Sequence, residues 1–313
     1  MQHSIQTHTI RGSDIDLNVL EIGVENSTTV VLVHGLRDSA HALVPLARHL
    51  SDENTGTKAY RVLITELRGH GASDSSSAYA MPNFILDLHA VVEALTDGTG
   101  ALFGHSLGGH VVSKYAALFP EFAKAIIVAE GLGPPKRTYA DDAAMEVAVY
   151  REMLLSRLGR RGDSGGRTKR PIKDLEDVTA RLLRNNPRMQ TDAAKQLAPY
   201  LVKSTSIGLQ WAFDSRASSV FIGSDESENR RFWRQVRASV CVISGTLSYE
   251  YWGPQMAQAD FSGHFAEGEM EARAQLFQHH EHHWFERSGH MIHYDEPERL
   301  AILCQQFLEK HHV

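Results

Sequence analysis

The chain has 313 residues, of which 42 % are hydrophobic and 22 % are charged, and its formal net charge at pH 7 is −6. This is the composition of an ordinary globular protein, and an acidic total without a recognisable binding module argues against nucleic-acid partners. No stretch approaches ~18 consecutive apolar residues and the amino terminus has no signal-peptide pattern, so membrane insertion and secretion are not expected.

The first buried strand is predicted at residues 29–33, where the apolar run Thr-Val-Val-Leu-Val stops at His34-Gly35-Leu36. A second apolar run, 101–103, leads into Gly-His-Ser-Leu-Gly-Gly at 104–109, which opens a helical pattern. This context predicts that Ser106 is a nucleophile on a sharp turn between a strand and a helix, where glycines let neighbouring backbone approach. At such a turn the oxyanion hole takes two main-chain N–H groups, for which we expect Leu107 and Leu36.

A third strand is predicted at 125–129, and Glu130 stands at its end. Between Gly133 and Ala238 strand signals mostly vanish, and this segment carries 20 Lys and Arg against 13 Asp and Glu, a formal +7, which leaves −13 for the rest of the chain. Such a basic segment is either a solvated helical surface or a device that steers an anionic substrate. Its predicted helices are 143–158, 175–185 and 191–201.

Two further strands are predicted near the carboxyl terminus, at 240–244 and at 284–287. The second is followed by Ser-Gly-His, which places His290 on a loop at a strand end, where a general base for the serine is expected. His293, three residues later, is the alternative base. A final helix is predicted to follow from Pro297.

Three stretches resemble the α/β-hydrolase fold family: Leu-Val-His-Gly at 32–35, Leu-Arg-Gly-His-Gly-Ala-Ser at 67–73, and the turn around Ser106. The resemblance implies an α/β fold with a mostly parallel central sheet flanked by helices and a helical cap inserted after the sixth strand. Residues 1–132 and 239–313 would form the core and 133–238 the cap. It also implies a Ser-acid-His triad in that chain order, with Ser106 as nucleophile and His290 as base.

The acid of this triad departs from the family's usual pattern. The loop after strand 240–244 has Ser248 where many members carry an aspartate. Two glutamates are candidates in its place: Glu130, at the end of an earlier strand where some relatives place the acid, and Glu250 in the later loop. We prefer Glu130, because a strand-end residue before the Gly-Pro segment 131–135 has a geometric reason to face the active-site edge.

Short motifs in and before the proposed cap resemble a subgroup of serine-hydrolase-like proteins in which the later aspartate is also absent. They lie at 130–135, 181–189 and 211–214. Three aromatic residues are candidates for lining a substrate pocket beneath the cap: Trp211, Tyr249 and Trp252.

No metal and no organic cofactor is expected. The histidines at 279, 280, 282 and 283 lack a carboxylate spaced to complete a metal site and are interpreted as an exposed helix end. Cys241 and Cys304 have no metal or redox spacing, and so few cysteines favour a cytoplasmic location.

The predicted function is cleavage of a carboxylic ester in a small to medium substrate through an acyl-enzyme. A serine at the turn argues against relatives that use aspartate there, but it does not separate an esterase from a thioesterase, lactonase, C–C bond hydrolase or cofactor-free perhydrolase. The alternative from another class is a ligand-binding protein with a silent triad, because of Ser248. The sequence contains no heptads or repeats, and monomer and dimer are equally compatible with it.

Overall fold

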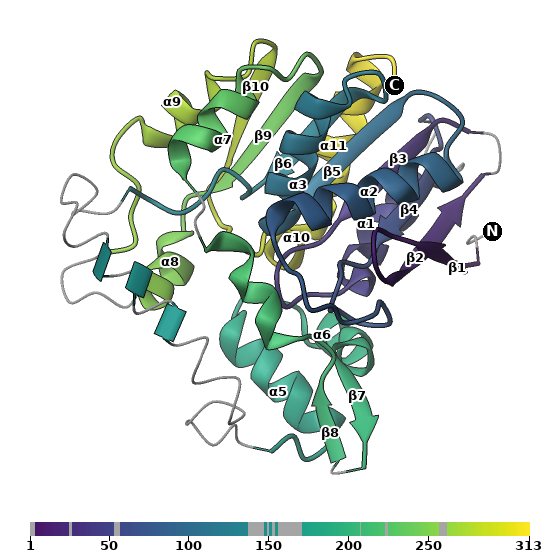
Figure 1. Ribbon diagram of the computed structural model, residues 1–313, viewed down its shortest axis with the longest axis vertical. Helices are drawn as coiled ribbons and strands as arrows, with labels where there is room; N and C mark the ends of the chain where they lie inside the picture. The colour runs from purple at the N-terminus through teal and green to yellow at the C-terminus, as the bar shows by residue number, and fades with distance from the viewer. Residues whose placement is uncertain are drawn as a thin grey trace.

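The computed structural model describes residues 4–24, 27–52, 57–136, 147–148, 150–151, 154–155, 171–206, 208–222, 225–256 and 262–313. At its centre lies an eight-stranded sheet with the strand order β1-β2-β4-β3-β5-β6-β9-β10 (Figure 1). β2 pairs antiparallel with β1 and with β4, and all other pairings in this sheet are parallel. The strands span Gln6–Arg11 (β1), Asp16–Gly23 (β2), Thr29–Val33 (β3), Arg61–Thr65 (β4), Gly100–His105 (β5), Ala123–Ala129 (β6), Ser239–Gly245 (β9) and His280–Phe285 (β10).

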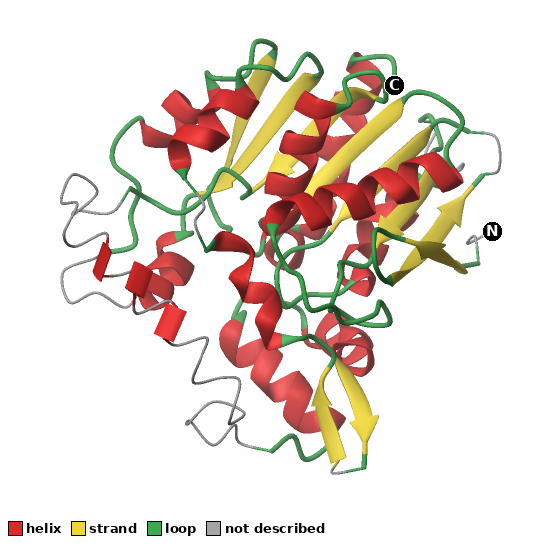
Figure 2. Ribbon diagram, viewed as in Figure 1, coloured by secondary structure: helices red, strands yellow, loops and turns green. Residues whose placement is uncertain are grey.

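Side chains of the central strands alternate between two hydrophobic cores, one on each face of the sheet. In β3, Val31 and Val33 belong to the first core, whereas Val30 and Leu32 belong to the second. The helices covering the first core are α2 (Met81–Leu95) and α3 (Leu107–Leu118), and those covering the second are α1 (Val44–Leu50) and α11 (Pro297–Lys310). The predicted parallel sheet with helices on both faces is therefore confirmed (Figure 2).

The segment between β6 and β9 forms a smaller layer at one end of the sheet (Figure 1). Its elements are α5 (Leu175–Asn185), α6 (Thr191–Leu197), the 3₁₀ helices Ala198–Leu201 and Ser215–Phe221, β7 (Val202–Thr205) and β8 (Gly208–Trp211). The last helix of the segment, α7 (Glu226–Trp233), lies beside the sheet instead, and its Trp233 belongs to the first hydrophobic core (Figure 1). A third hydrophobic core joins Val178 and Leu182 of α5 to Ala42 and Tyr294, which lie outside the segment. The insertion after the sixth strand is thus confirmed, and we propose 133–238 as the cap and 1–132 with 239–313 as the core.

Two features of this segment differ from the sequence-based expectation. The hairpin of β7 and β8 replaces part of the expected all-helical region, because strands of four residues are too short to show a periodic signal. Gly208 has φ +106° at the start of β8, a conformation that favours glycine. The predicted helix at 143–158 falls largely outside the described residues.

The histidine cluster also differs from its prediction. Its members His280, His282 and His283 lie in β10, which begins four residues before the predicted strand, and not at a helix end. β10 is an edge strand of the sheet, where partly exposed polar side chains are tolerated. The remaining helices are α8 (Tyr249–Met256), α9 (Glu269–Ala274) and α10 (Ile292–Asp295).

Both cysteines are buried and free, as expected of small hydrophobic side chains in a strand and a helix face. In the part of the chain that the structure describes, none of the helices combines the length and the apolar character needed to cross a bilayer.

Candidate active site

Ser106 lies on the turn between β5 and α3. Its backbone has φ +52° and ψ −115°, a conformation rare for a residue with a side chain, and its amide donates a hydrogen bond to the carbonyl oxygen of Ala129 at 3.0 Å. The flanking glycines explain how so sharp a turn fits. A Cβ on Gly104 would lie 2.2 Å from the carbonyl oxygen of Gly108, and a Cβ on Gly108 would lie 2.2 Å from that of Val33. The side chain of Ser106 is consequently held at the end of the sheet.

His290 lies on the loop after β10, between Ser106 and Glu130. Its Nε2 is 3.0 Å from Ser106 Oγ, and its Nδ1 is 2.9 Å from Glu130 Oε2. Because an ionised carboxylate only accepts hydrogen bonds, Nδ1 carries the proton and Nε2 is left to accept from the serine hydroxyl. His290 is 4 % exposed and Glu130 is 6 % exposed, so water does not compete for this hydrogen bond.

Glu130 is positioned by backbone contacts at the end of β6. Its φ is +51°, its amide donates to the Ile243 carbonyl oxygen at 2.8 Å, and its Oε1 accepts from the Gly245 amide at 2.7 Å. The two carboxylate oxygens therefore have separate partners, one in the β9 loop and one on His290. This fixes the orientation of the carboxylate toward the imidazole.

The other candidates for the acid lie elsewhere. Ser248 is buried, and its hydroxyl donates to the Gly245 carbonyl oxygen at 2.9 Å. Glu250 is partly exposed and accepts from Arg188 at 2.8 Å, in a contact between the cap segment and α8. Of the two glutamates named from the sequence, the structure brings Glu130 to His290 and gives Glu250 to Arg188.

The turn after β3 holds Leu36, the first predicted oxyanion-hole residue. The amide of Asp38 donates to the Gly35 carbonyl oxygen at 3.3 Å and closes the turn, and Arg37 within it has φ +66°. Among the residues that the structure describes, neither the Leu36 nor the Leu107 amide has a hydrogen-bond acceptor. Both N–H groups therefore keep their predicted role as oxyanion donors, which stays a prediction.

Two buried histidines support this turn. His34 accepts from the Leu67 amide at Nε2 and donates from Nδ1 to the Gly35 carbonyl oxygen, at 3.1 and 2.7 Å. His70 accepts from the Arg37 amide at 2.9 Å and donates from Nδ1 to the Arg68 carbonyl oxygen at 3.0 Å. His70 must be neutral to make both of its contacts, and burial lowers the pKa of His70 to about 4.

Buried histidines with a lowered pKa are expected to make the free energy of unfolding depend on pH. Burial also lowers the pKa of His110 to about 3, with Lys114 and Arg273 adding to the effect. In the unfolded chain both imidazoles bind a proton near pH 6.5, so the unfolded state holds more protons below that pH and the folded state loses stability as the pH falls. Between its folded-state and unfolded-state pKa values, each histidine lowers the free energy of unfolding by about 1.4 kcal/mol for every pH unit of acidification. We expect these two imidazoles together to lower the free energy of unfolding by about 2.5 kcal/mol between pH 5.5 and pH 4.5.

Urea denaturation at a series of pH values measures this slope. The carboxyl of Asp38 adds little in the same window, because its pKa is lowered from 3.8 to about 2 and most of its effect falls below pH 4. His110→Gln is expected to reduce the slope by about 1.4 kcal/mol per pH unit. An unchanged slope in that variant would contradict a neutral His110.

Two aromatic side chains of α8 cover the imidazole of His290. The ring of Tyr251 stacks on it with centroids 4.0 Å apart and an interplanar angle of 13°, and Trp252 approaches it edge-on at 5.0 Å. Trp252 was expected near the site. Tyr251 could also be named as a pocket residue from the sequence, in the segment Tyr-Glu-Tyr-Trp at 249–252, but it was not one of the three preferred candidates.

The other two aromatic candidates have different contacts. Tyr249 stacks on His264 at 4.1 Å, and Trp211 packs against the third hydrophobic core, with Phe213 at 6.5 Å. Neither ring contacts the imidazole of His290 in the part of the chain that the structure describes.

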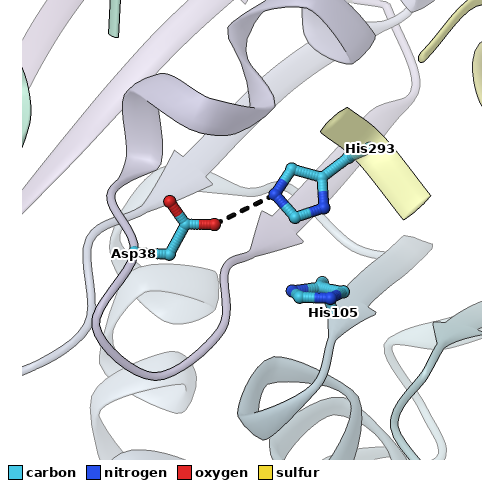
Figure 3. A group of neighbouring side chains, drawn as sticks. All are labelled: Asp38, His105 and His293. Carbon is cyan, nitrogen blue, oxygen red and sulfur yellow. Dashed lines mark hydrogen bonds and ion pairs between the residues drawn. The ribbon is translucent and has the colours of Figure 1, made fainter. Parts of the chain in front are cut away.

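His293, the alternative base, is engaged by another partner. Its Nε2 lies 3.0 Å from Asp38 Oδ2, and the neighbouring Tyr294 donates to Asp38 Oδ1 at 2.6 Å (Figure 3). These contacts join the turn that carries Leu36 to the loop that carries His290. They were not foreseen, because Asp38 and His293 are far apart in the sequence.

Comparison with known proteins identifies the family of the chain. A family model described as the alpha/beta hydrolase family matches residues 30–302. A serine hydrolase-like protein of Danio rerio is 28 % identical over 114 residues, which are 36 % of this chain and 33 % of that relative, so the match spans about a third of the relative's length. Serine hydrolase-like protein 2 of Homo sapiens is 21 % identical over 293 residues, 91 % of this chain and 88 % of that one.

Among solved structures, a thioesterase domain from the curacin biosynthetic pathway superposes with a TM-score of 0.76 at 18 % identity. The superposition includes 97 % of this chain and 99 % of that domain. This likeness shows the fold. Together with the family match, it confirms the resemblance that the motifs at 32–35, 67–73 and 104–109 indicated. The chain belongs to the alpha/beta hydrolase family.

Proposed function

We propose that this chain is a serine hydrolase that cleaves a carboxylic ester, or a related acyl bond, of a small to medium substrate through an acyl-enzyme. The observation that carries the proposal is the unbroken hydrogen-bond path from Ser106 Oγ through His290 to Glu130. A serine hydroxyl is a weak nucleophile unless a base accepts its proton, and this path provides the base and the group that orients it.

In the proposed first step, His290 Nε2 takes the Ser106 proton while Oγ attacks the carbonyl carbon. The amides of Leu36 and Leu107 bind the resulting oxyanion, and each donor is expected to lower the barrier by roughly 3 kcal/mol. Glu130 stabilises the imidazolium. The imidazolium then gives its proton to the leaving alcohol, and the acyl group remains on Ser106.

In the second step, His290 takes a proton from water, the hydroxide attacks the acyl carbon, and the proton returns to Ser106 as the acid leaves. The rings of Tyr251 and Trp252 limit water around the imidazole, which strengthens its interaction with Glu130. Neither step requires a metal or an organic cofactor.

Two observations favour an enzyme over a ligand-binding protein of the same fold. A silent triad was considered because Ser248 stands where many family members carry the triad aspartate. In the structure, Glu130 provides a carboxylate to His290 from another strand. The second observation is that the amides of Leu36 and Leu107 have no acceptor among the described residues and can serve as oxyanion donors. Thioester, lactone and C–C bond cleavage and perhydrolysis use the same Ser106 chemistry, so a panel of such substrates follows the ester assay.

The proposal is tested by the intact mass of the protein after incubation with a fluorophosphonate. The wild-type chain is expected to gain one adduct, and Ser106→Ala is expected to gain none. Ser113→Ala is a matched control, because that hydroxyl is buried in α3 and donates to the His110 carbonyl oxygen. A folded wild-type protein without an adduct would favour the ligand-binding alternative.

A further inference from the structure

Beside the Ser106 path lies a second group of buried polar side chains, formed by Asp38, His105 and His293 (Figure 3). One oxygen or nitrogen atom from each of the three lies within 4.8 Å of the others. Their exposed fractions are 5 %, 1 % and 6 %. They come from three segments, the turn after β3, the end of β5 and α10, so the fold brings them together.

The protonation of His105 follows from its contacts. Its Nε2 lies 2.8 Å from the carbonyl oxygen of His290, and a carbonyl oxygen can only accept, so Nε2 carries the proton and Nδ1 carries a lone pair. That lone pair has no hydrogen-bond partner among the described residues. It faces the turn that ends at Asp38, since a Cβ on Gly35 would lie 2.8 Å from it.

A metal-binding histidine usually has this arrangement, with one ring nitrogen donating to a backbone carbonyl and the other left for the ion. Asp38 is oriented in a similar way. Its Oδ1 accepts from the Ser39 amide at 2.9 Å and from the Tyr294 hydroxyl at 2.6 Å, which directs Oδ2 toward His293.

His293 completes the set. Its Nε2 is 3.0 Å from Asp38 Oδ2, a separation close to the roughly 3.3 Å between two ligand atoms of a tetrahedral zinc ion. Its Nδ1 is buried and has no hydrogen-bond partner in the described part of the chain. The lone pair on His105 Nδ1 is the unpartnered group that an ion in this cluster would satisfy, since buried polar groups normally find a partner.

We propose that Asp38, His105 and His293 form a binding site for a divalent transition-metal ion. Two imidazoles and one carboxylate suit Zn²⁺, Co²⁺ or Ni²⁺, whereas Mg²⁺ and Ca²⁺ prefer oxygen ligands alone. The ion replaces the hydrogen bond between Asp38 Oδ2 and His293 Nε2, and the imidazole proton moves to His293 Nδ1, so that the ring stays neutral. Metal binding would tie the Leu36 turn to the His290 loop and to the residue before Ser106.

Binding is measured directly, so the outcome does not depend on the proposed hydrolase activity. The metal-free wild-type protein is titrated with Co²⁺, and the visible absorption of tetrahedral cobalt is followed together with the metal content per chain. We expect one ion per chain, and we expect His105→Gln to weaken binding by more than about 100-fold, because losing a ligand costs at least as much as losing a partner of that ligand.

The matched control is His283→Gln. His283 and Glu281 of the edge strand β10 form another group that could hold an ion, together with Cys241 of the neighbouring β9. An ion there would be lost in this variant and kept in His105→Gln. A crystal of the wild-type protein grown with Zn²⁺ locates the ion by anomalous scattering without any substitution. Density between Asp38, His105 and His293 supports the proposal. An ion bound only at other residues, or no stoichiometric binding, overturns it.

Discussion

His290→Gln is expected to lower kcat for ester hydrolysis by about 10⁶-fold, because a serine and its base act as one unit and removal of either abolishes the activated nucleophile. His290 Nε2 is the acceptor for the Ser106 hydroxyl at 3.0 Å, and glutamine offers no group that takes a proton near neutral pH. KM is expected to change far less than kcat, since the imidazole acts mainly in the transition state. Steady-state rates with an activated aryl ester give both constants.

His8→Gln is the control for this substitution. His8 lies in β1, at the edge of the sheet opposite to β10, and contacts Glu21 at 2.8 Å, so its loss is expected to leave the rate unchanged. Unfolding curves for both variants separate a catalytic loss from a folding defect. If folded His290→Gln kept a rate within tenfold of wild type, another residue would be the base and the proposed mechanism would be wrong.

The turn at Ser106 could be predicted from the sequence because its determinants are local. Gly104 and Gly108 are needed where backbone atoms would meet a Cβ at 2.2 Å, and that need is visible as a motif. The same holds for β3 and β5, whose apolar runs end at the site. Local determinants of this kind were enough to predict the turn at Ser106, the turn after β3 and the loop that carries His290.

Contacts between distant segments could not be predicted in the same way. Glu130 was preferred on position alone, and only the structure brings its carboxylate 2.9 Å from His290. The stacking of Tyr251 on His290 depends on the path of α8, and the contact of Asp38 with His293 joins residues 255 positions apart. Sequence periodicity carries no information about such pairs, because they arise from the packing of whole elements.

Glu130→Gln is expected to lower kcat by about 10⁴-fold without unfolding the protein. A glutamine side chain retains an acceptor for the Gly245 amide, which Glu130 Oε1 binds at 2.7 Å, so the local structure is kept. Its amide nitrogen would then face His290 Nδ1 as a donor. The imidazole would respond by carrying its proton on Nε2, where it can no longer accept from Ser106. Steady-state kinetics and a thermal unfolding curve measure the two parts of this expectation.

The matched control is Glu250→Gln, which removes the same charge from the other glutamate considered for the triad. Glu250 binds Arg188 in the partly exposed contact between α8 and the cap segment. Because an exposed ion pair contributes little to stability, we expect Glu250→Gln to retain nearly full activity. The reverse result, with Glu130→Gln active and Glu250→Gln inactive, would assign the acid to the later loop. It would also require that loop to rearrange on substrate binding, because in this structure Glu130 is the carboxylate that contacts His290.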